Sequence, residues 1–281
     1  MRLQVLLSAM NLKTEAYIDT LNITSDAVVV NQTKAQKEAS ENTAAQSDGS
    51  GEILSIERIR RENINGEKQE VVFIESSERG LSRSRNMAIQ NATADICILC
   101  DNDVEYVPGY DRLILKAFEK NKDADLIIFF IKRKERSAPI FRTERKMGYL
   151  SVLKIFSPEI AFRRESVKDI PFHPLFGAGA RYFMGEENLF LYECLKRKKK
   201  ILYVPVQLAE LREEESSWFQ GYDKRFFVSR GANYAAMSRR FSTLLILQFA
   251  IRKRKLYDRE TSFQNALKYM LDGKQEYLRS L

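Results

Sequence analysis

The chain reads Ile96-Cys97-Ile98-Leu99-Cys100-Asp101-Asn102-Asp103 where a wholly apolar run gives way to two acidic residues. A short apolar run without alternation is typical of a strand that is covered on both faces of a parallel sheet. Ligands of open α/β sheets bind at the carboxyl ends of such strands. This run therefore predicts a buried strand that places Asp101 and Asp103 at a ligand-binding edge.

Strand and helix patterns alternate around this run, which favours an α/β domain with a mainly parallel sheet. Strands are expected at residues 3–8, 27–31, 71–74, 126–131 and 202–204, and helices at 14–21, 81–92 and 110–120. Residues 53–59 fit either a short helix or a strand that leads to an Asn-Gly turn. The carboxy-terminal part is mostly helical, and its last helix is expected to start at Thr261 and to end at Gly273.

The chain has three cysteines, of which Cys97 and Cys100 form a Cys-x-x-Cys pattern. Residues three apart in a strand point to opposite faces, so these two sulfur atoms are expected to diverge. Three thiols in a chain of 281 residues cannot form a disulfide framework. We interpret the cysteines as core residues of a protein in a reducing compartment, in preference to a redox or metal site.

The positive charge of the chain is concentrated near its carboxyl end. Residues 224–255 contain nine Lys and Arg and no Asp or Glu, which exceeds the net charge of +8 for the whole chain. These cations flank the apolar run 241–251, an arrangement that indicates an anionic membrane surface more than a nucleic acid. The alternative is a buried helix with a solvated basic end. Neither this run nor any other reaches the roughly 20 residues that a membrane-spanning helix needs.

The acidic pair has a defined chemistry. Asp101 and Asp103, with no histidine beside them, form a hard oxygen site that suits Mg²⁺ or Mn²⁺. Such ions keep coordination positions for phosphate oxygens. The alternative is two solvated aspartates in a turn.

Two further segments carry groups that suit a diphosphate and a proton transfer. Gly80-Leu81-Ser82-Arg83-Ser84-Arg85-Asn86 places a glycine turn before a helix, and helix amino termini and guanidinium groups both bind phosphate. Arg83 and Arg85 cannot share a helix face, so at most one is expected to reach a diphosphate. A glycine-containing loop at 176–185 leads to Glu186 and Glu187, although acidic residues at a helix start also suit the helix dipole with no function.

In this order, the segments resemble the family-2 glycosyltransferases of the GT-A fold, especially bacterial enzymes of polysaccharide and capsule biosynthesis. The resemblance rests on residues 5–8, 80–86, 101–103 and 185–188 and covers roughly residues 1–220. It implies a Rossmann-like GT-A catalytic domain over 1–220, with a nucleotide-binding half (1–105) and an acceptor half (106–220). A helical, basic extension over 221–281 would follow.

The resemblance implies a metal-dependent, inverting transfer of a sugar from a nucleotide sugar, most simply a UDP-sugar, to a glycan or lipid-linked glycan. Asp101 and Asp103 would hold Mn²⁺ or Mg²⁺ on the diphosphate, and the Glu186-Glu187 pair would supply the base, with Glu187 at its usual position. The implied contacts to the nucleotide sugar are Ser8, Asn31, Gln32, Gly80, Arg85, Asp101, Asn102 and Arg212. Trp218 is a candidate to stack on an acceptor sugar, or else a core residue.

The sequence departs from the family's pattern at three places. Glu187 stands where the base is usually an Asp, and Asn31 and Gln32 stand where an Asp often reads the nucleotide base. Many members also carry a histidine that helps to bind the metal or diphosphate, where this chain has Arg212. The only histidine, His173, lies in a different loop, in which we expect a structural role.

Two other functions use the same features. A nucleotidyltransferase acting on a sugar phosphate would need a glycine-rich basic loop after the first strand, and Ser8-Ala9-Met10-Asn11 is not one. A non-catalytic sugar- or lipid-binding module with a GT-A fold is the second alternative. We predict a cytoplasmic enzyme at the inner face of the cell membrane, with peripheral contact to anionic lipid and no nucleic-acid partner.

Overall fold

The computed structural model describes residues 1–33, 52–212, 219 and 221–281. Contacts divide the chain into two compact units. The first unit comprises Met1–Arg79, Arg83–Pro171 and Cys194–Glu214, and the second comprises Gly80–Ser82, Phe172–Glu193 and Glu215–Leu281. The functional division expected at residue 220 stays a prediction. Within the described residues, no helix is both long enough and apolar enough to cross a membrane.

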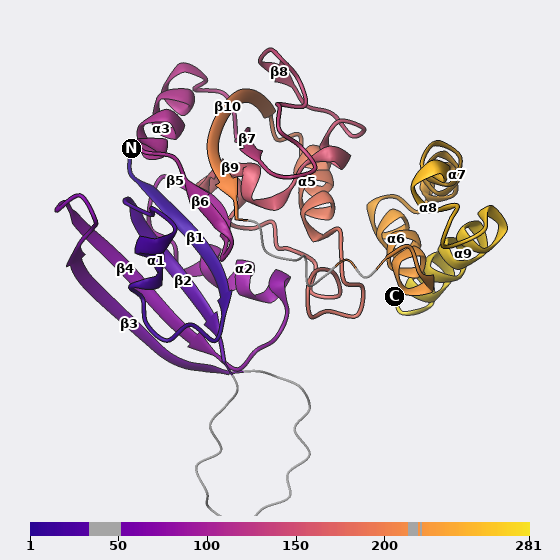
Figure 1. Ribbon diagram of the computed structural model, residues 1–281, viewed down its shortest axis with the longest axis horizontal. Coiled ribbons are helices and arrows are strands. Elements are labelled where there is room, and N and C mark those ends of the chain that lie inside the picture. Colours follow the sequence, from indigo (N-terminus) through magenta and orange to yellow (C-terminus); the bar gives the residue numbers. More distant parts are fainter. Residues whose placement is uncertain (34–51, 213–218, 220) are drawn as a thin grey trace, which may run out of the picture. The chain divides into compact units, whose positions relative to one another are not determined.

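A mixed β-sheet forms the centre of the first unit, with strand order β3-β4-β2-β1-β5-β9-β7-β10-β6 (Figure 1). The strands are β1 (Leu3–Met10), β2 (Asp26–Gln32), β3 (Ile53–Glu62), β4 (Lys68–Ser76), β5 (Ile96–Asp101), β6 (Val104–Tyr106), β7 (Leu126–Lys132), β8 (Arg145–Lys146), β9 (Ile160–Arg163) and β10 (Ile201–Leu211). Strands β4, β2, β1 and β5 form a continuous parallel block. This confirms the expected α/β class.

Antiparallel strands border and interrupt the parallel arrangement. Strand β3 pairs antiparallel with β4, which settles the choice left open for residues 53–59 in favour of a strand. Strand β9 lies between β5 and β7 and is antiparallel to both, a position that no local sequence pattern predicted. The helices α1 (Tyr17–Thr20), α2 (Leu81–Asn91), α3 (Tyr110–Lys120) and α4 (Arg164–Val167) connect the strands.

The cysteines of β5 are core residues, as expected. Cys97 and Cys100 are both fully buried. Burial raises the pKa of the Cys97 thiol to about 12. Burial likewise raises the pKa of Cys100 well above its ordinary value. Both thiols are therefore protonated at neutral pH and unsuited to redox or metal chemistry.

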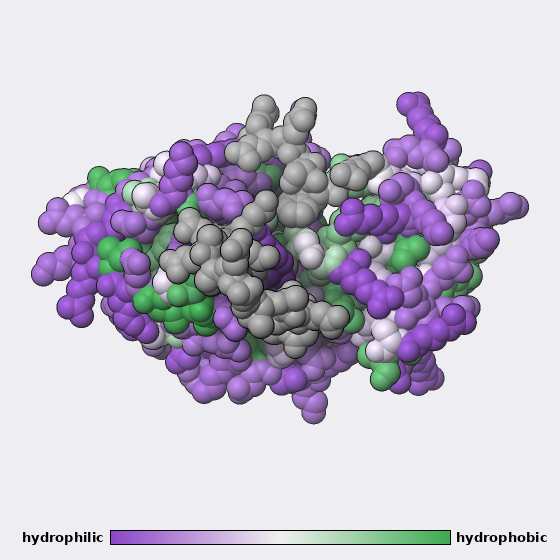
Figure 2. Space-filling view, turned by 90° about the horizontal axis from the view of Figure 1, so that it is seen from below, coloured by the Kyte–Doolittle hydropathy of each residue, from purple (hydrophilic) through white to green (hydrophobic). Residues whose placement is uncertain are grey.

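The second unit consists mainly of helices. Hydrophilic residues dominate the coloured surface of the molecule seen in Figure 2. Its helices are α6 (Lys224–Met237), α7 (Ser242–Arg252), α8 (Arg254–Tyr257) and α9 (Phe263–Arg279), and α5 (Glu186–Lys196) begins in it. The expectation that Gly273 ends the last helix is wrong, because α9 continues to Arg279. Its amino terminus is capped by the side chain of Ser262, one residue after the expected Thr261.

Gly273 is required by the close approach of two helices. A Cβ added there would lie 2.0 Å from the carbonyl oxygen of Val228 on α6. The converse contact exists at Gly231 of α6, where a Cβ would lie 1.9 Å from the carbonyl oxygen of Met270. Two glycines on opposite helices therefore let the α6 and α9 backbones touch.

We predict that Gly273→Ala lowers the midpoint of thermal unfolding. Overpacking of this kind destabilises by about 1–3 kcal/mol, which outweighs the gain of about 1 kcal/mol that alanine brings to an ordinary helix position. Gly148→Ala is the control, because a Cβ there meets nothing within 4 Å. Circular dichroism on both variants measures the difference. Equal midpoints would show that α6 and α9 do not approach as closely as described.

Candidate active site

The carboxyl ends of β1, β2 and β5 carry four of the polar residues singled out in the sequence. The strand register pairs Ser8 with Asp101 and Gln32 with Ser76, and Asn31 precedes Gln32 on β2. Because these strands are parallel, their carboxyl ends share one edge of the sheet, where ligands of such sheets bind. The structure thus brings four of the predicted contact residues to a single edge.

A buried ion pair joins α2 to this edge. The Nη2 of Arg85 donates to Oδ1 of Asp101 at 2.9 Å and to Oγ of Ser157 at 2.7 Å. The Arg85 side chain is only 1% exposed, whereas that of Asp101 is 20% exposed. A guanidinium stays charged at any ordinary pH, so it holds the Asp101 carboxylate in a fixed orientation beside a permanent positive charge.

Arg83 takes a different direction from Arg85, as their spacing predicted. Its Nη1 donates to Oε1 of Glu78 at 2.5 Å, and its side chain is 41% exposed. Of the two arginines, Arg85 is therefore the one that reaches the acidic pair.

The turn between β5 and β6 contains Asn102 and Asp103, and both of its carbonyl groups are held. The Tyr17 hydroxyl donates to the Asn102 carbonyl oxygen at 2.8 Å, and the Arg212 backbone N–H donates to the Asp103 carbonyl oxygen at 2.8 Å. The Arg212 guanidinium contacts Glu105 (Nε–Oε2, 3.2 Å) and the Thr20 carbonyl. Arg212 thus fixes the turn through its backbone, and a contact of its side chain with a diphosphate stays a prediction.

Asp101 and Asp103 remain the candidate metal ligands. Among the residues that the structure describes, no group of three or more His, Cys, Asp and Glu could hold a metal ion. Two carboxylates still fit Mg²⁺ or Mn²⁺, because these ions are commonly held by one or two protein carboxylates while substrate phosphates and water fill the remaining positions. The donor set fits an ion that binds together with a diphosphate.

The amides of Asn31 and Gln32 are engaged with the backbone. Asn31 is fully buried; its Oδ1 accepts from the Leu12 N–H at 2.8 Å and its Nδ2 donates to the Leu12 carbonyl at 3.0 Å. The Nε2 of Gln32 donates to the Glu78 carbonyl at 2.6 Å. These bonds fix the segments that follow β1 and precede α2, and recognition of a nucleotide base by either amide stays a prediction.

In the second unit, the glycine-containing loop at 176–185 holds the start of α2. The Leu81 N–H donates to the Ala178 carbonyl at 2.9 Å, and the Ser82 hydroxyl donates to the Phe176 carbonyl at 2.7 Å. A Cβ on Gly179 would lie 3.4 Å from the Cα of Gly80. No sequence pattern linked these two segments, because the hydrogen bonds end on backbone carbonyl groups and span about a hundred residues.

The same loop is anchored by α6 and α9. The Arg181 guanidinium donates to Oε1 of Glu276 at 2.7 Å, and the Tyr182 hydroxyl donates to the same oxygen at 3.2 Å. At the other end of the loop, Nδ2 of the buried Asn233 donates to the Gly185 carbonyl at 2.9 Å. The residue before Glu186 is therefore fixed by α6.

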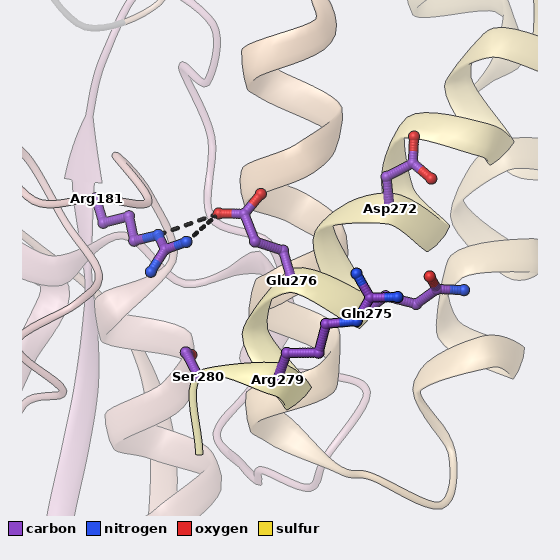
Figure 3. Close-up of a pocket in the computed structure, with 6 residues that line it drawn as sticks. All are labelled: Arg181, Asp272, Gln275, Glu276, Arg279 and Ser280. Atoms are coloured by element: carbon purple, nitrogen blue, oxygen red, sulfur yellow. Dashed lines mark hydrogen bonds and ion pairs between the residues drawn. The ribbon is translucent and has the colours of Figure 1, made fainter.

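Figure 3 shows the contact between the loop and α9. The side chain of Arg181 points at Glu276 beside a cavity of about 480 Å³. The other residues that line this cavity are Asp272, Gln275, Arg279 and Ser280. Its walls are charged and polar throughout, so it is a surface depression over the ion pair rather than an apolar ligand pocket.

His173 also serves this anchorage. Its Nε2 lies 3.1 Å from the hydroxyl of Tyr277 on α9, and its ring meets Phe176 edge-on at a centroid distance of 5.0 Å. Burial lowers the pKa of His173, so the ring is neutral at pH 7. These contacts agree with the structural role expected for it.

Glu186 and Glu187 begin α5 and differ in exposure. Glu186 is buried, at 5% exposure, whereas Glu187 is half-buried. A Cβ on Gly177, whose φ is +101°, would lie 3.1 Å from Cδ of Glu186. Gly177 therefore leaves the space that Glu186 occupies, and Glu187 is the more accessible of the two carboxylates. Trp218 lies outside the described residues.

We predict that Gly177→Ala destabilises the protein more than Gly66→Ala does. Both glycines have positive φ, but a Cβ on Gly66 meets nothing within 4 Å. The control therefore carries only the backbone strain of about 1–2 kcal/mol, while Gly177→Ala must also displace Glu186. Thermal unfolding measures both changes.

A double-mutant cycle tests the cause of this difference. In a Glu186→Ala background, the extra destabilisation of Gly177→Ala should disappear, because the crowded atoms of Glu186 are gone. If the extra cost persists without the Glu186 side chain, another contact of Gly177 is responsible.

Comparison with known proteins agrees with this architecture. Residues 47–183 match the model of Glycosyl transferase family 2. This match includes residues 80–86 and 101–103 and ends before Glu186. A search of the curated proteins gave no match.

Solved structures of S. aureus TarS 1–349 are similar in fold. One is 14% identical, with a TM-score of 0.58, and the alignment covers 100% of this chain and 83% of that chain. Its complex with UDP-GlcNAc gives the same identity and TM-score, with 100% and 81% covered. Its complex with UDP is 14% identical, with a TM-score of 0.52, and 100% and 92% are covered. These likenesses confirm the GT-A fold.

Proposed function

Because residues 47–183 are a family-2 glycosyltransferase sequence on a GT-A fold, we propose that this chain transfers a sugar from a UDP-sugar to a hydroxyl group of a glycan or lipid-linked glycan. The observation that carries the proposal is the buried Arg85, which fixes Asp101 at the carboxyl edge of the parallel strands. The choice of UDP draws support from the S. aureus TarS complexes with UDP-GlcNAc and with UDP.

The donor diphosphate is assigned to the acidic pair. Asp101 and Asp103 would hold Mn²⁺ or Mg²⁺, which supplies Lewis-acid neutralisation of the charge that develops on the diphosphate. Arg85 holds the Asp101 carboxylate in a fixed orientation. Tyr17 and Arg212 hold the carbonyl groups of the intervening turn, so Asp103 is presented from a fixed backbone. This preorganisation is what electrostatic catalysis requires.

The acceptor is assigned to the carboxylates that begin α5. Glu187 takes the proton from the acceptor hydroxyl while the oxygen of that hydroxyl forms a bond to the anomeric carbon of the donor sugar. The bond from that carbon to the diphosphate oxygen breaks at the same time, and its electron pair leaves with UDP. Direct displacement inverts the anomeric carbon. Glu186, buried beneath Gly177, would hold the first turn of α5 in place.

The biological setting of the proposal rests on the family resemblance together with the distribution of charge. The basic residues near the carboxyl end suit an anionic membrane surface, so we assign the enzyme to polysaccharide or capsule synthesis on a lipid-linked acceptor at the cytoplasmic face of the membrane. Nothing in this assignment requires a nucleic-acid partner.

We predict that UDP-sugars raise the thermal unfolding midpoint in the presence of Mn²⁺. A ligand at about 100 times its Kd stabilises the folded state by about 2.7 kcal/mol, which corresponds to roughly 5–10 °C for a chain of this size. Asp103→Ala should remove the Mn²⁺-dependent part of the rise. Asp123→Ala is the control, because Asp123 is an exposed carboxylate in a second Asp-x-Asp that precedes β7.

An unchanged Mn²⁺-dependent rise in Asp103→Ala would contradict the assignment of the acidic pair. The blank omits the nucleotide sugar. In it, neither variant should show a rise above the wild-type baseline. Absence of a rise with UDP-sugars, or a rise with GDP- or CMP-sugars alone, would contradict the proposed donor class.

We predict that Glu187→Gln retains donor binding and loses about 10²–10⁴-fold in the rate of sugar transfer, because a neutral amide cannot take the acceptor proton. Radiolabelled sugar transfer to an acceptor, or donor hydrolysis by water, gives the rate, and the thermal shift gives binding. Glu119→Gln is the matched control, because Glu119 is exposed on the surface of α3. Wild-type rates in Glu187→Gln would assign the base to Glu186 or another group.

A further inference from the structure

Helix α7 is apolar on two opposite faces. One face, with Leu245, Ile246 and Ala250, is buried, and the helix packs against α6 and α9. The opposite face is exposed: Leu244 is 64%, Leu247 38% and Ile251 64% accessible to solvent. These three residues, spaced three and four apart, lie on one side of the helix, and we name them the outer face of α7.

An exposed apolar face on a packed helix requires an explanation. A surface helix usually presents polar residues to water, and a helix that is apolar all round is normally covered on all sides. Phe241, at 54% exposure, extends the apolar character one turn before the outer face. Contiguous exposed apolar side chains mark sites of interaction.

Cations border the outer face at both ends. Arg239 and Arg240 precede α7, and the exposed run Arg252-Lys253-Arg254-Lys255 follows the last apolar residue. On a third side, Nζ of Lys274 on α9 donates to Oγ1 of Thr243 at 2.6 Å. The sequence has no Asp or Glu from 224 to 255, and the next acidic residue is Asp258.

We propose that the outer face of α7 docks on an anionic lipid bilayer. Leu244, Leu247 and Ile251 would enter the boundary between headgroups and acyl chains, while the flanking cations contact lipid phosphate groups. A bilayer presents this combination of an apolar layer beneath a negatively charged border, and amphipathic helices with Lys and Arg beside Leu and Phe bind it in this way. A protein partner or a second copy of the chain would have to supply both features on one surface.

The inference rests in part on the proposed function, because docking would bring the enzyme to a lipid-linked acceptor. Binding to the bilayer itself does not depend on sugar transfer. The two ideas can therefore fail separately.

The test is co-sedimentation of the full chain with vesicles of phosphatidylcholine alone and of phosphatidylcholine with phosphatidylglycerol. We expect binding to the anionic vesicles that weakens with added salt, since surface charges are screened. Leu244→Ser with Ile251→Ser should weaken it roughly tenfold or more. The matched control is Leu150→Ser with Leu113→Ser, two exposed leucines elsewhere, at 68% and 37% exposure.

A charge variant tests the second component. Arg252→Gln with Lys253→Gln should reduce binding to anionic vesicles roughly tenfold, because each cation near such a surface contributes to attraction. Arg58→Gln with Arg60→Gln removes the same charge from the exposed surface of β3 and should change binding little. Equal loss in both pairs would reduce the effect to net charge and overturn the assignment to α7.

Two further results would overturn the proposal. One is the absence of binding to anionic vesicles. The other is a concentration-dependent dimer, seen by sedimentation velocity, that Leu244→Ser with Ile251→Ser abolishes while vesicle binding persists; the outer face would then be a contact between copies. The thermal shift with UDP-sugar and Mn²⁺ is measured on the same variants, so a loss of donor binding is distinguished from a loss of docking.

Discussion

The rest of the candidate site depends on the ion pair between Arg85 and Asp101. A guanidinium that is 1% exposed has lost its hydration, and the Asp101 carboxylate and the Ser157 hydroxyl replace part of it. Removing one partner of a buried pair typically costs about 3–5 kcal/mol. Asp101 therefore contributes to the stability of the sheet edge in addition to the role proposed for it, whereas Asp103 lies on the adjoining turn. Effects at the two aspartates should not be equated.

Local patterns in the sequence were sufficient for the elements that depend on local forces. Helix α3 was predicted with its observed bounds, Tyr110–Lys120, because its apolar spacing is regular. The apolar run of β5 was equally clear, and parallel topology then placed the strand ends at one edge. Strand β9 was missed because four residues carry little pattern and its place is fixed by partners far away in the chain.

The position of the acidic pair at the end of β5 was predictable from the sequence, whereas the contacts that support it were not. Residue types at the strand ends identified the acidic pair. The sequence did not show that the Asn31 amide hydrogen-bonds to both the N–H and the carbonyl of Leu12. Glycine was the most ambiguous signal. Gly273 follows an apolar pattern, as a glycine that ends a helix would. It instead lies within α9, where the close approach of α6 leaves no room for a side chain. Only the neighbouring helix decides between these roles, and it is about forty residues away.

The helices after residue 223 do more than extend the chain, since α6 and α9 hold the loop that leads to Glu186 through Asn233 and Glu276.

One practical consequence follows from the cysteines. Cys97, Cys100 and Cys194 are all buried. A thiol in this state reacts slowly with maleimides and other alkylating reagents, which require an accessible thiolate. The three native cysteines should therefore add little background to a labelling experiment. A single cysteine introduced on the surface would react selectively with a fluorophore or spin label, without prior removal of the native cysteines.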